Sequence, residues 1–201
     1  MSVKPLRARQ AEATRNLLIA VARENFTEHG YAATSIDDII QQAGVARGAL
    51  YHHFSGKEAL FRAVYETVEH EVVARVMEAA TPEASPWDAV RAGLSAFLDA
   101  CLDPAFRRIV VLDSVSVLQS KALEVGIDPV ELPMLRTVLT PLIGTTTFMG
   151  IAIDALAHVA LGGLYGAALY IARASDPRAA RAEIDVVLDT LVAGLLRPAA
   201  R

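Results

Sequence analysis

The side chains with the clearest chemical potential lie in one short stretch of the chain. Arg47 is the only long polar side chain among residues 46–49, and its guanidinium can donate to guanine O6 and N7 or hold a phosphate. Gly48 and Ala49 beside it allow close approach and can touch a thymine methyl group. Together these residues indicate contact with duplex DNA.

Two short helices and a tight turn would position these side chains. Ser35 and Asp38 have the spacing of a capping box, which predicts a helix that begins near Ile36. Gly44 is a natural left-handed end for that helix, and a second helix is predicted from about Ala46 to His53. A helix-turn-helix of this kind inserts the N-terminal residues of its second helix into the major groove. The pattern alone is weak evidence, because any soluble helical protein can contain it.

More DNA-facing candidates follow the second helix. Tyr51, His52 and His53 lie at its end, and Ser55 opens another capping box that places Lys57 in the first turn of the next helix. A helix N-terminus binds phosphate, and the lysine would reinforce it. Replacing Lys57 with alanine is therefore expected to weaken all DNA binding and to reduce its salt slope by about one. For His52, packing or a solvated surface is an equally good interpretation.

Short segments spread over residues 14–60 carry a family resemblance. They are Thr14-Arg15, Leu18-Ile19, Val21-Ala22, Phe26, Gly30-Tyr31, Thr34-Ser35-Ile36, Asp38-Ile39, Ala43-Gly44-Val45, Gly48, Leu50-Tyr51, His53-Phe54 and Lys57-Glu58. With these residues the stretch resembles the DNA-binding domain of the TetR/AcrR family of bacterial transcriptional regulators. The resemblance implies a DNA surface made of Thr34, Ser35, Arg47, Gly48, Ala49, Tyr51, His52, His53 and Lys57.

Two positions depart from the pattern of that family. Ala46 stands where the family often has Ser or Thr, so a phosphate-binding hydroxyl and an N-cap are missing. Asn25 stands where the family often has an apolar residue, which predicts looser packing of the first helix. The first departure can weaken the affinity for DNA or shift the contacts.

Charge and composition agree with a DNA-binding cytoplasmic protein. Residues 1–57 carry seven basic and five acidic side chains, whereas the rest of the chain carries 12 basic and 18 acidic ones, and this asymmetry directs DNA to one end. Hydrophobic residues make up 53% of the chain, which leaves apolar surface to bury against a partner. The single Cys101 and the absence of an apolar leader predict a reducing, cytoplasmic location, and the family resemblance implies a bacterial protein on the nucleoid.

One stretch has the length and polarity of a membrane span. Residues 155–172 contain only one ionisable side chain, His158. Asp154 at the start and the lack of a basic residue before Arg173 argue against insertion, so no membrane association is predicted. A helix that is apolar all round also suits a subunit interface.

Helix signals recur along the chain without a convincing strand pattern. The sequence predicts an all-α protein of about nine helices, with a three-helix DNA-binding domain at residues 1–55 and a helical effector-binding and dimerisation domain at residues 56–201. Beyond the helix-turn-helix, helices are predicted at about 11–29, 56–79, 86–102, 103–125, 154–174 and 177–196. Residues 128–143 are predicted to be irregular, because Pro133 and Pro141 interrupt them.

The last two predicted helices are candidates for a subunit interface. Their apolar candidates for this contact are Leu164, Ile184, Val187, Leu188, Leu191, Val192 and Leu195. The family resemblance implies that these helices pair with their copies in a second subunit as a four-helix bundle. The alternative is that both helices only cover the core of their own subunit.

The resemblance also implies a small-molecule pocket in the middle of the chain. Its candidate lining is Trp87, Phe97, Cys101, Phe106, Val110, Val117, Met134, Phe148, Met149 and Tyr165, with Asp113 or His158 as polar anchors. Ordinary core packing is the alternative for each of these residues. The lack of a strong charge cluster there favours a neutral or lipophilic effector over a multiply charged one.

These observations predict a regulator that binds a palindromic double-stranded operator as a homodimer and is released by a small effector, most simply a repressor. Enzyme activity, a cofactor and a metal are not predicted, since there is no HExxH, GxSxG or glycine-rich phosphate loop. The pairs His52-His53 and His70-Glu71 lack a third ligand at metal spacing. A DNA-binding architectural protein without an effector is the main alternative, and an uncharacterised helical enzyme is a weaker one.

Overall fold

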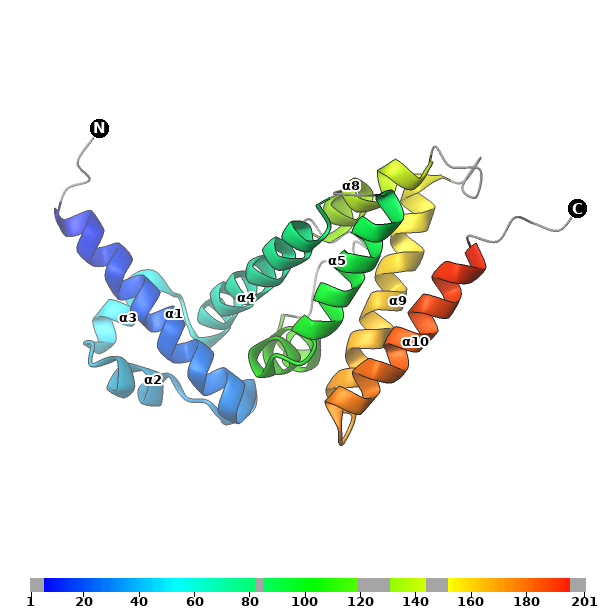
Figure 1. The fold of residues 1–201 in the computed structure, drawn as a ribbon. Coiled ribbons are helices and arrows are strands. Elements are labelled where there is room, and N and C mark those ends of the chain that lie inside the picture. The colour runs from blue at the N-terminus through cyan, green and yellow to red at the C-terminus, as the bar shows by residue number, and fades with distance from the viewer. Residues whose placement is uncertain (1–5, 82–84, 119–130, 144–151, 196–201) are drawn as a thin grey trace, which may run out of the picture.

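A computed structural model describes residues 6–81, 85–118, 131–143 and 152–195 of the chain, and within these ranges every regular element is helical. The all-α prediction is therefore confirmed. Figure 1 shows a three-helix unit at one end, a long helix leading from it, and a body of helices whose outer edge is formed by α9 and α10. The helices are α1 (Leu6–Ala33), α2 (Ile36–Ala43), α3 (Arg47–His53), α4 (Lys57–Ala79), α5 (Pro86–Ala100), η1 (Phe106–Asp113), α6 (Ser114–Val117), α8 (Glu131–Ile143), α9 (Ile153–Arg173) and α10 (Pro177–Leu195).

The three-helix unit is held together by an apolar core shared with α4. Leu18, Phe26, Ile39, Leu50 and Phe61 are fully buried. The ring of Phe26 packs edge-on against that of Phe61, with 5.1 Å between the centroids. Since Phe61 lies on α4, the same ring contacts fix the direction in which α4 leaves the unit.

Helix α1 is interrupted near its end by Gly30. This residue has φ 76° and ψ 170°, a region that residues with a Cβ atom almost never adopt. The Arg108 guanidinium lies over it, and a Cβ atom built there would be 1.9 Å from Nη2 of Arg108. Just beyond the break, the Tyr31 N–H donates to Oδ2 of Asp113 at 2.8 Å, and Nε of Arg108 donates to the same oxygen at 3.2 Å. The break therefore forms a polar joint between the three-helix unit and η1.

Replacing Gly30 with alanine should lower the free energy of unfolding by about 1–3 kcal/mol, because the backbone conformation there is strained for any residue with a Cβ atom. Urea denaturation of the purified protein measures this change. Gly48→Ala is the matched control: Gly48 is helical with open space around it, so its replacement should leave stability unchanged or raise it by about 0.5–1 kcal/mol. Equal stability of the two variants would contradict the strain argument.

Helix α4 connects the three-helix unit to the helical body. Leu60, Val64, Val68 and Val72 form an apolar stripe on this helix, and all four side chains are buried. The predicted cap at Ser55 is wrong, since α4 begins after Gly56 and has no side-chain cap. Helix α1 also begins earlier than predicted, at Leu6 rather than near residue 11.

Polar side chains cap several helices of the helical body. The Ser85 hydroxyl accepts from the Asp88 N–H at 3.1 Å, and Asp176 Oδ1 accepts from the Arg178 N–H at 3.0 Å. After Asp103, whose carboxylate accepts from two backbone N–H groups, the chain forms η1, a π-helix that ends with the Ser114 N–H donating to Ile109 O. π-Helices are rare and are frequently found at functional sites.

Helix α8 differs from its prediction. Residues 131–143 form one continuous helix with Pro141 inside it, not an irregular segment. Pro133 lies in the first turn, where the backbone N–H has no partner within the helix, and Pro141 lies close to the C-terminal end. Leu132, Leu135, Leu139 and Leu142 of this helix form a second apolar cluster with α5 and α9.

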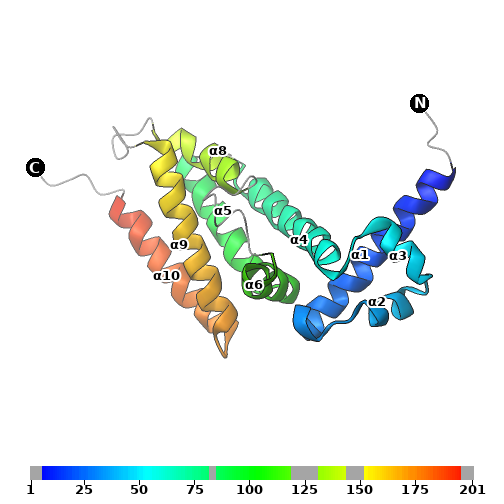
Figure 2. The same ribbon diagram turned by 180° about the vertical axis from the view of Figure 1, so that it is seen from behind.

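Helix α9 is long and apolar enough to cross a membrane by composition, with a mean hydropathy of 1.5, yet only 28% of its most apolar window is buried within one subunit. Seen from behind, α9 and α10 lie side by side along the edge farthest from the three-helix unit (Figure 2). A largely open apolar helix on an outer edge suits contact with another protein chain as well as it suits lipid.

Candidate nucleic-acid interface

The turn between α2 and α3 has the geometry that its sequence predicts. The Ser35 hydroxyl accepts from the Asp38 N–H at 3.1 Å and donates to the carboxylate of the same residue at 2.6 Å. Gly44 adopts a left-handed conformation, and its N–H bonds to the last carbonyls of α2. Ala46 then starts α3 without a side-chain cap, as the missing hydroxyl predicts. The two helices form a helix-turn-helix.

One face of α3 is open to solvent. Leu50 and Phe54 face the core, whereas Arg47, Gly48, Tyr51 and His52 are exposed and Ala49 is half-buried. The Arg47 guanidinium lies 5.9 Å from the centre of the Tyr51 ring and 3.1 Å from a carboxylate oxygen of Asp37. Both contacts are on the surface, so the side chain can exchange them for contacts to a base or a phosphate.

His53 turns away from this face, toward α1. Its ring contacts those of His52 and Phe54, and the Arg15 guanidinium lies over the Phe54 ring. Partial burial lowers the pKa of His53, and the nearby His52 and Arg15 lower it further. His53 is therefore mainly neutral near pH 7 and adds little positive charge to the surface.

Two residues expected at the DNA surface have structural roles instead. Thr34 is buried, and its hydroxyl donates to Gly30 O at 2.8 Å, so the expectation that this side chain lies at the surface is wrong. The Ser35 side chain is exposed, but its hydroxyl is engaged as the cap of α2. The sequence spacing correctly identified Ser35 as the cap of α2. It did not reveal that Thr34 is buried, because Thr34 folds back over the break in α1.

Lys57 ties the start of α4 to the segment between α1 and α2. Its ammonium donates to Tyr31 O and Thr34 O, both at 2.9 Å, and lies 4.3 Å from the centre of the Tyr31 ring. Burial raises the pKa of the Tyr31 hydroxyl, and the charge of Glu58 raises it further. Because two of its three donors are engaged, we revise the interpretation of Lys57 from a phosphate contact to a brace within the DNA-binding unit.

Replacing Lys57 with methionine should lower the free energy of unfolding by about 1–3 kcal/mol, since two carbonyls lose a charged donor. Urea denaturation measures the loss, and titration of DNA binding against salt should show the wild-type slope. Arg62→Met is the control, because Arg62 is exposed on the same helix and only pairs with Glu58 across one turn. A normal stability together with a reduced salt slope would restore the phosphate role.

Asn25 packs more tightly than its sequence position suggested. It is buried, its amide nitrogen donates to Gln42 Oε1 at 2.7 Å, and Gln42 Nε2 donates back to Asn25 Oδ1 at 3.3 Å. The expectation of looser packing of α1 is therefore wrong: a reciprocal amide pair joins α1 to α2 where an apolar contact was expected.

A second candidate site lies inside the helical body. Of the predicted pocket residues, Phe97, Phe106, Met134 and Tyr165 line one cavity, together with Glu69, Val72, Val73, Val76, Leu135, Leu161 and Leu164. Glu69 was missed by the sequence analysis, although it lies on α4 two turns before the buried Val76 and so on the apolar side of the helix.

The other predicted pocket residues lie elsewhere. Cys101 and Val110 belong to the core, and burial raises the pKa of the Cys101 thiol to about 12. Val117 packs against the same core, and Trp87 packs against the cluster around α8. Neither expected anchor lies at the cavity, because Asp113 bonds to Tyr31 and His158 is exposed with its ring nitrogen on Asp154 O. Phe148 and Met149 are outside the described residues.

The predicted subunit-contact residues fall into two groups. Ile184 and Leu188 pack partly against the subunit's own core, and Leu164 lines the cavity. Val187 and Leu191 are 52% and 58% exposed on α10. The side chains of Val192 and Leu195 are outside the described part of the structure.

No group of three or more His, Cys, Asp or Glu side chains in the described ranges has the geometry to hold a metal ion. The arrangement is instead that of a helix-turn-helix DNA-binding protein with a helical body. Residues 18–64 match the family model "Bacterial regulatory proteins, tetR family", and residues 87–195 match "Tetracyclin repressor-like, C-terminal domain". The chain belongs to the TetR family and is a DNA-binding transcriptional regulator.

Relatives support this assignment over different lengths. A TetR-family transcriptional regulator from Pectobacterium atrosepticum is 34% identical, with a TM-score of 0.79 over 94% of this chain and 98% of that one. TtgR of Pseudomonas putida is 36% identical over 103 residues, which cover 50% of this chain and 49% of TtgR. UidR of Escherichia coli is 36% identical over 69 residues, 35% of its length. The chain thus spans half or less of these two curated relatives, both of which are named transcriptional regulators.

Proposed function

We propose that this protein is an effector-responsive repressor that binds a palindromic operator as a homodimer in the bacterial cytoplasm, on the nucleoid. The observation that carries the proposal is the arrangement of three features: an exposed α3 face at one end, an open apolar face on α9 and α10, and a cavity between them. We also propose residues 1–55 as the DNA-binding domain and residues 56–201 as the domain for effector and partner subunit.

The outer face of α9 and α10 supports a homodimer. Val159 of α9 is 76% exposed and Tyr170 is 52% exposed. Gly162, Gly163 and Gly166 lie between them at helical spacing, and a Cβ atom added at any of these glycines would meet open space. Tyr170 donates to Glu183 of α10 at 2.5 Å, which aligns the two helices along this face. Small residues let helices of two subunits approach closely, and large exposed apolar side chains favour burial against a partner.

The contacts of η1 support a coupling between the cavity and the DNA-binding end. Phe106 at the start of η1 lines the cavity, and Asp113 at its end accepts the hydrogen bond from the Tyr31 N–H. An effector that displaces Phe106 would move the joint at Gly30 and the start of α4. The separation of the two α3 helices would then no longer fit successive major grooves, and operator affinity would fall.

Selection of duplexes from a random DNA library tests the proposal. The protein is first unfolded and refolded to remove bound small molecules, and bound duplexes are then sequenced. We expect a two-fold symmetric consensus whose half-sites are one helical turn apart, about 34–36 Å. A consensus with a single half-site would contradict the dimer, and no enrichment at low salt would contradict the operator-binding function.

A further inference from the structure

An ion pair joins the two helices of the helix-turn-helix at its exposed surface. Nη2 of Arg47, the first residue of α3, lies 3.1 Å from Oδ1 of Asp37 in the first turn of α2. The two side chains are 60% and 70% exposed, so the pair is open to an approaching duplex. An acidic side chain at such a place repels the phosphates and lowers the general affinity for DNA. Asp37 therefore opposes non-specific binding beside the arginine that is the candidate base reader.

Asp37 is not part of the capping box of α2. The neighbouring Asp38 has that role, because its N–H donates to the Ser35 hydroxyl at 3.1 Å and its carboxylate accepts from the same hydroxyl at 2.6 Å. The ion pair of Asp37 is on the surface, and pairs of this kind contribute little to stability. Replacing Asp37 should therefore leave the fold intact, so its effect on DNA binding can be measured separately.

The ion pair restricts the Arg47 side chain and leaves donors free. The guanidinium contacts Asp37 on α2, and it lies 5.9 Å from the centre of the Tyr51 ring on its own helix. Both contacts reduce the conformational freedom that Arg47 must lose when it binds DNA. A guanidinium has five N–H donors, so the contact of Nη2 with one carboxylate oxygen leaves donors for O6 and N7 of guanine.

The charge of the pair distinguishes bases from phosphates. A phosphate at Arg47 would have to displace the Asp37 carboxylate or lie beside it, and both arrangements are unfavourable because the two groups are anions. Guanine offers uncharged acceptors, which Arg47 can bind while the ion pair persists.

From this geometry we infer that Asp37 is a specificity-determining residue, which positions Arg47 for a guanine and opposes its contact with the phosphates of non-operator DNA. The inference rests on the proposed operator-binding function, and it names a base that the protein selects and a positioning residue for that selection.

Fluorescence anisotropy tests the inference with three kinds of duplex: the duplex selected by the wild-type protein, versions of it in which each G·C pair is replaced in turn by A·T, and a duplex of scrambled sequence. Asp37→Asn should bind the scrambled duplex about two- to fivefold more tightly for each bound subunit. At one guanine of each half-site, the affinity lost on replacement should fall by a similar factor. This guanine should be the one to which Arg47→Ala becomes insensitive.

Asp189→Asn is the matched control. Asp189 is 57% exposed and pairs with Arg91 in the helical body at 3.5 Å, so the variant makes the same charge change in a similar surface ion pair. It should bind all the duplexes like wild type. Asp37→Glu keeps the charge and should retain the wild-type affinity for the scrambled duplex. Circular dichroism checks the fold, and Asp37→Ala should give the results expected of Asp37→Asn if that variant does not fold.

Three results would overturn the inference: an unchanged affinity of Asp37→Asn for the scrambled duplex, a consensus without a G·C pair, or a loss of discrimination at a base that Arg47→Ala still discriminates. The scrambled duplex needs no operator. A selection without any consensus would therefore contradict the operator-binding function, while the affinities for the scrambled duplex would still decide whether Asp37 opposes contact with phosphates.

Discussion

Replacing Arg47 with alanine should cost more DNA affinity than any other single substitution on α3. The guanidinium is 60% exposed at the N-terminal end of the helix, and the contacts it makes without DNA are surface contacts to Asp37 and Tyr51. A base contact of this kind contributes about 1–3 kcal/mol. An operator bound by two subunits would lose about 2–6 kcal/mol, which is between about 30-fold and about 10⁴-fold in affinity. Fluorescence anisotropy with the selected duplex measures the loss.

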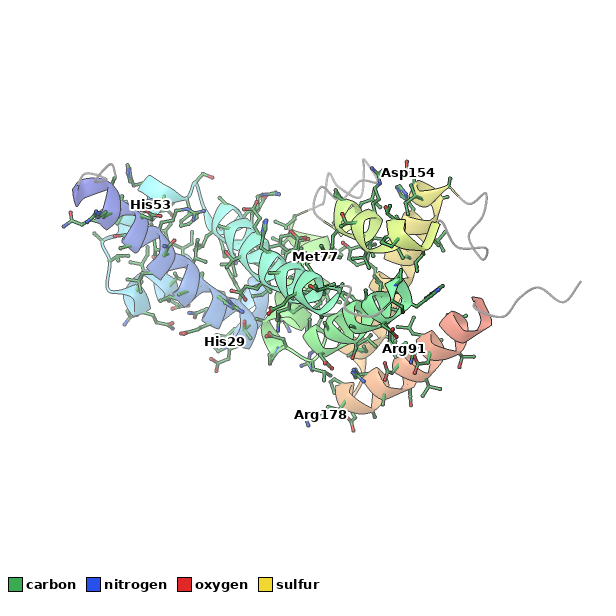
Figure 3. The ribbon with its side chains drawn as sticks, turned by 45° about the horizontal axis from the view of Figure 1, so that its top comes forward. His29, His53, Met77, Arg91, Asp154 and Arg178 are labelled. Atoms are coloured by element: carbon green, nitrogen blue, oxygen red, sulfur yellow. The ribbon has the colours of Figure 1, made fainter. Side chains whose placement is uncertain are left out.

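Arg91→Ala is the matched control for this experiment. Arg91 is also 60% exposed and also forms a surface ion pair, with Asp189 at 3.5 Å, but it lies in the helical body far from His53 (Figure 3). Its replacement removes the same charge and should leave operator affinity unchanged. An equal loss in both variants would mean that net charge, not a local contact, governs binding. Relaxed specificity at one base of each half-site, with an unchanged salt slope, would identify base recognition over phosphate binding.

Replacing Val187 with glutamate should convert the proposed dimer to a monomer. The side chain is 52% exposed on the open face of α10, so the subunit itself should keep its stability, whereas two carboxylates would meet in the proposed interface. A monomer reads one half-site, and the loss of linked binding should lower operator affinity by about 10²-fold to 10⁴-fold. Analytical ultracentrifugation measures the mass, and anisotropy measures the affinity.

Val115→Glu provides the comparison for that variant. Val115 is 59% exposed on α6, a helix outside the α9 and α10 face, and the same substitution there should leave both mass and affinity unchanged. A dimer that survives Val187→Glu would place the subunit contact elsewhere. A monomer that keeps full operator affinity would contradict the requirement for two linked recognition helices.

The features that the sequence predicted correctly depend on residues close together in the chain. The cap at Ser35 involves a partner three positions away, and the left-handed end at Gly44 depends on that residue alone. Ser55 has the same spacing pattern, yet α4 starts without it. Lys57 at the start of α4 instead makes long-range contacts to Tyr31 O and Thr34 O, which local spacing cannot reveal.

The features that were missed depend on distant partners. Lys57 bonds to carbonyls 23 and 26 positions away, and the Tyr31 N–H bonds to a carboxylate 82 positions away. His158 and Leu164 were misplaced for a related reason. On a helix that is apolar all round, the sequence does not indicate which face packs inward, so His158 was expected inside and Leu164 at the subunit contact, whereas His158 is exposed and Leu164 lines the cavity. The sequence analysis missed Glu69 because a glutamate next to valines on a helix is usually expected to be exposed to solvent.

The buried thiol of Cys101 makes this protein convenient for distance measurements. It is the only cysteine of the chain, it is fully buried, and burial raises its pKa to about 12, so thiol-directed reagents at neutral pH find almost no reactive thiolate. A cysteine introduced at an exposed position of α3 would thus be labelled selectively, without first removing the native one. Spin labels on the two subunits of the proposed dimer could then report the spacing of the recognition helices directly, in the free protein and in the DNA complex.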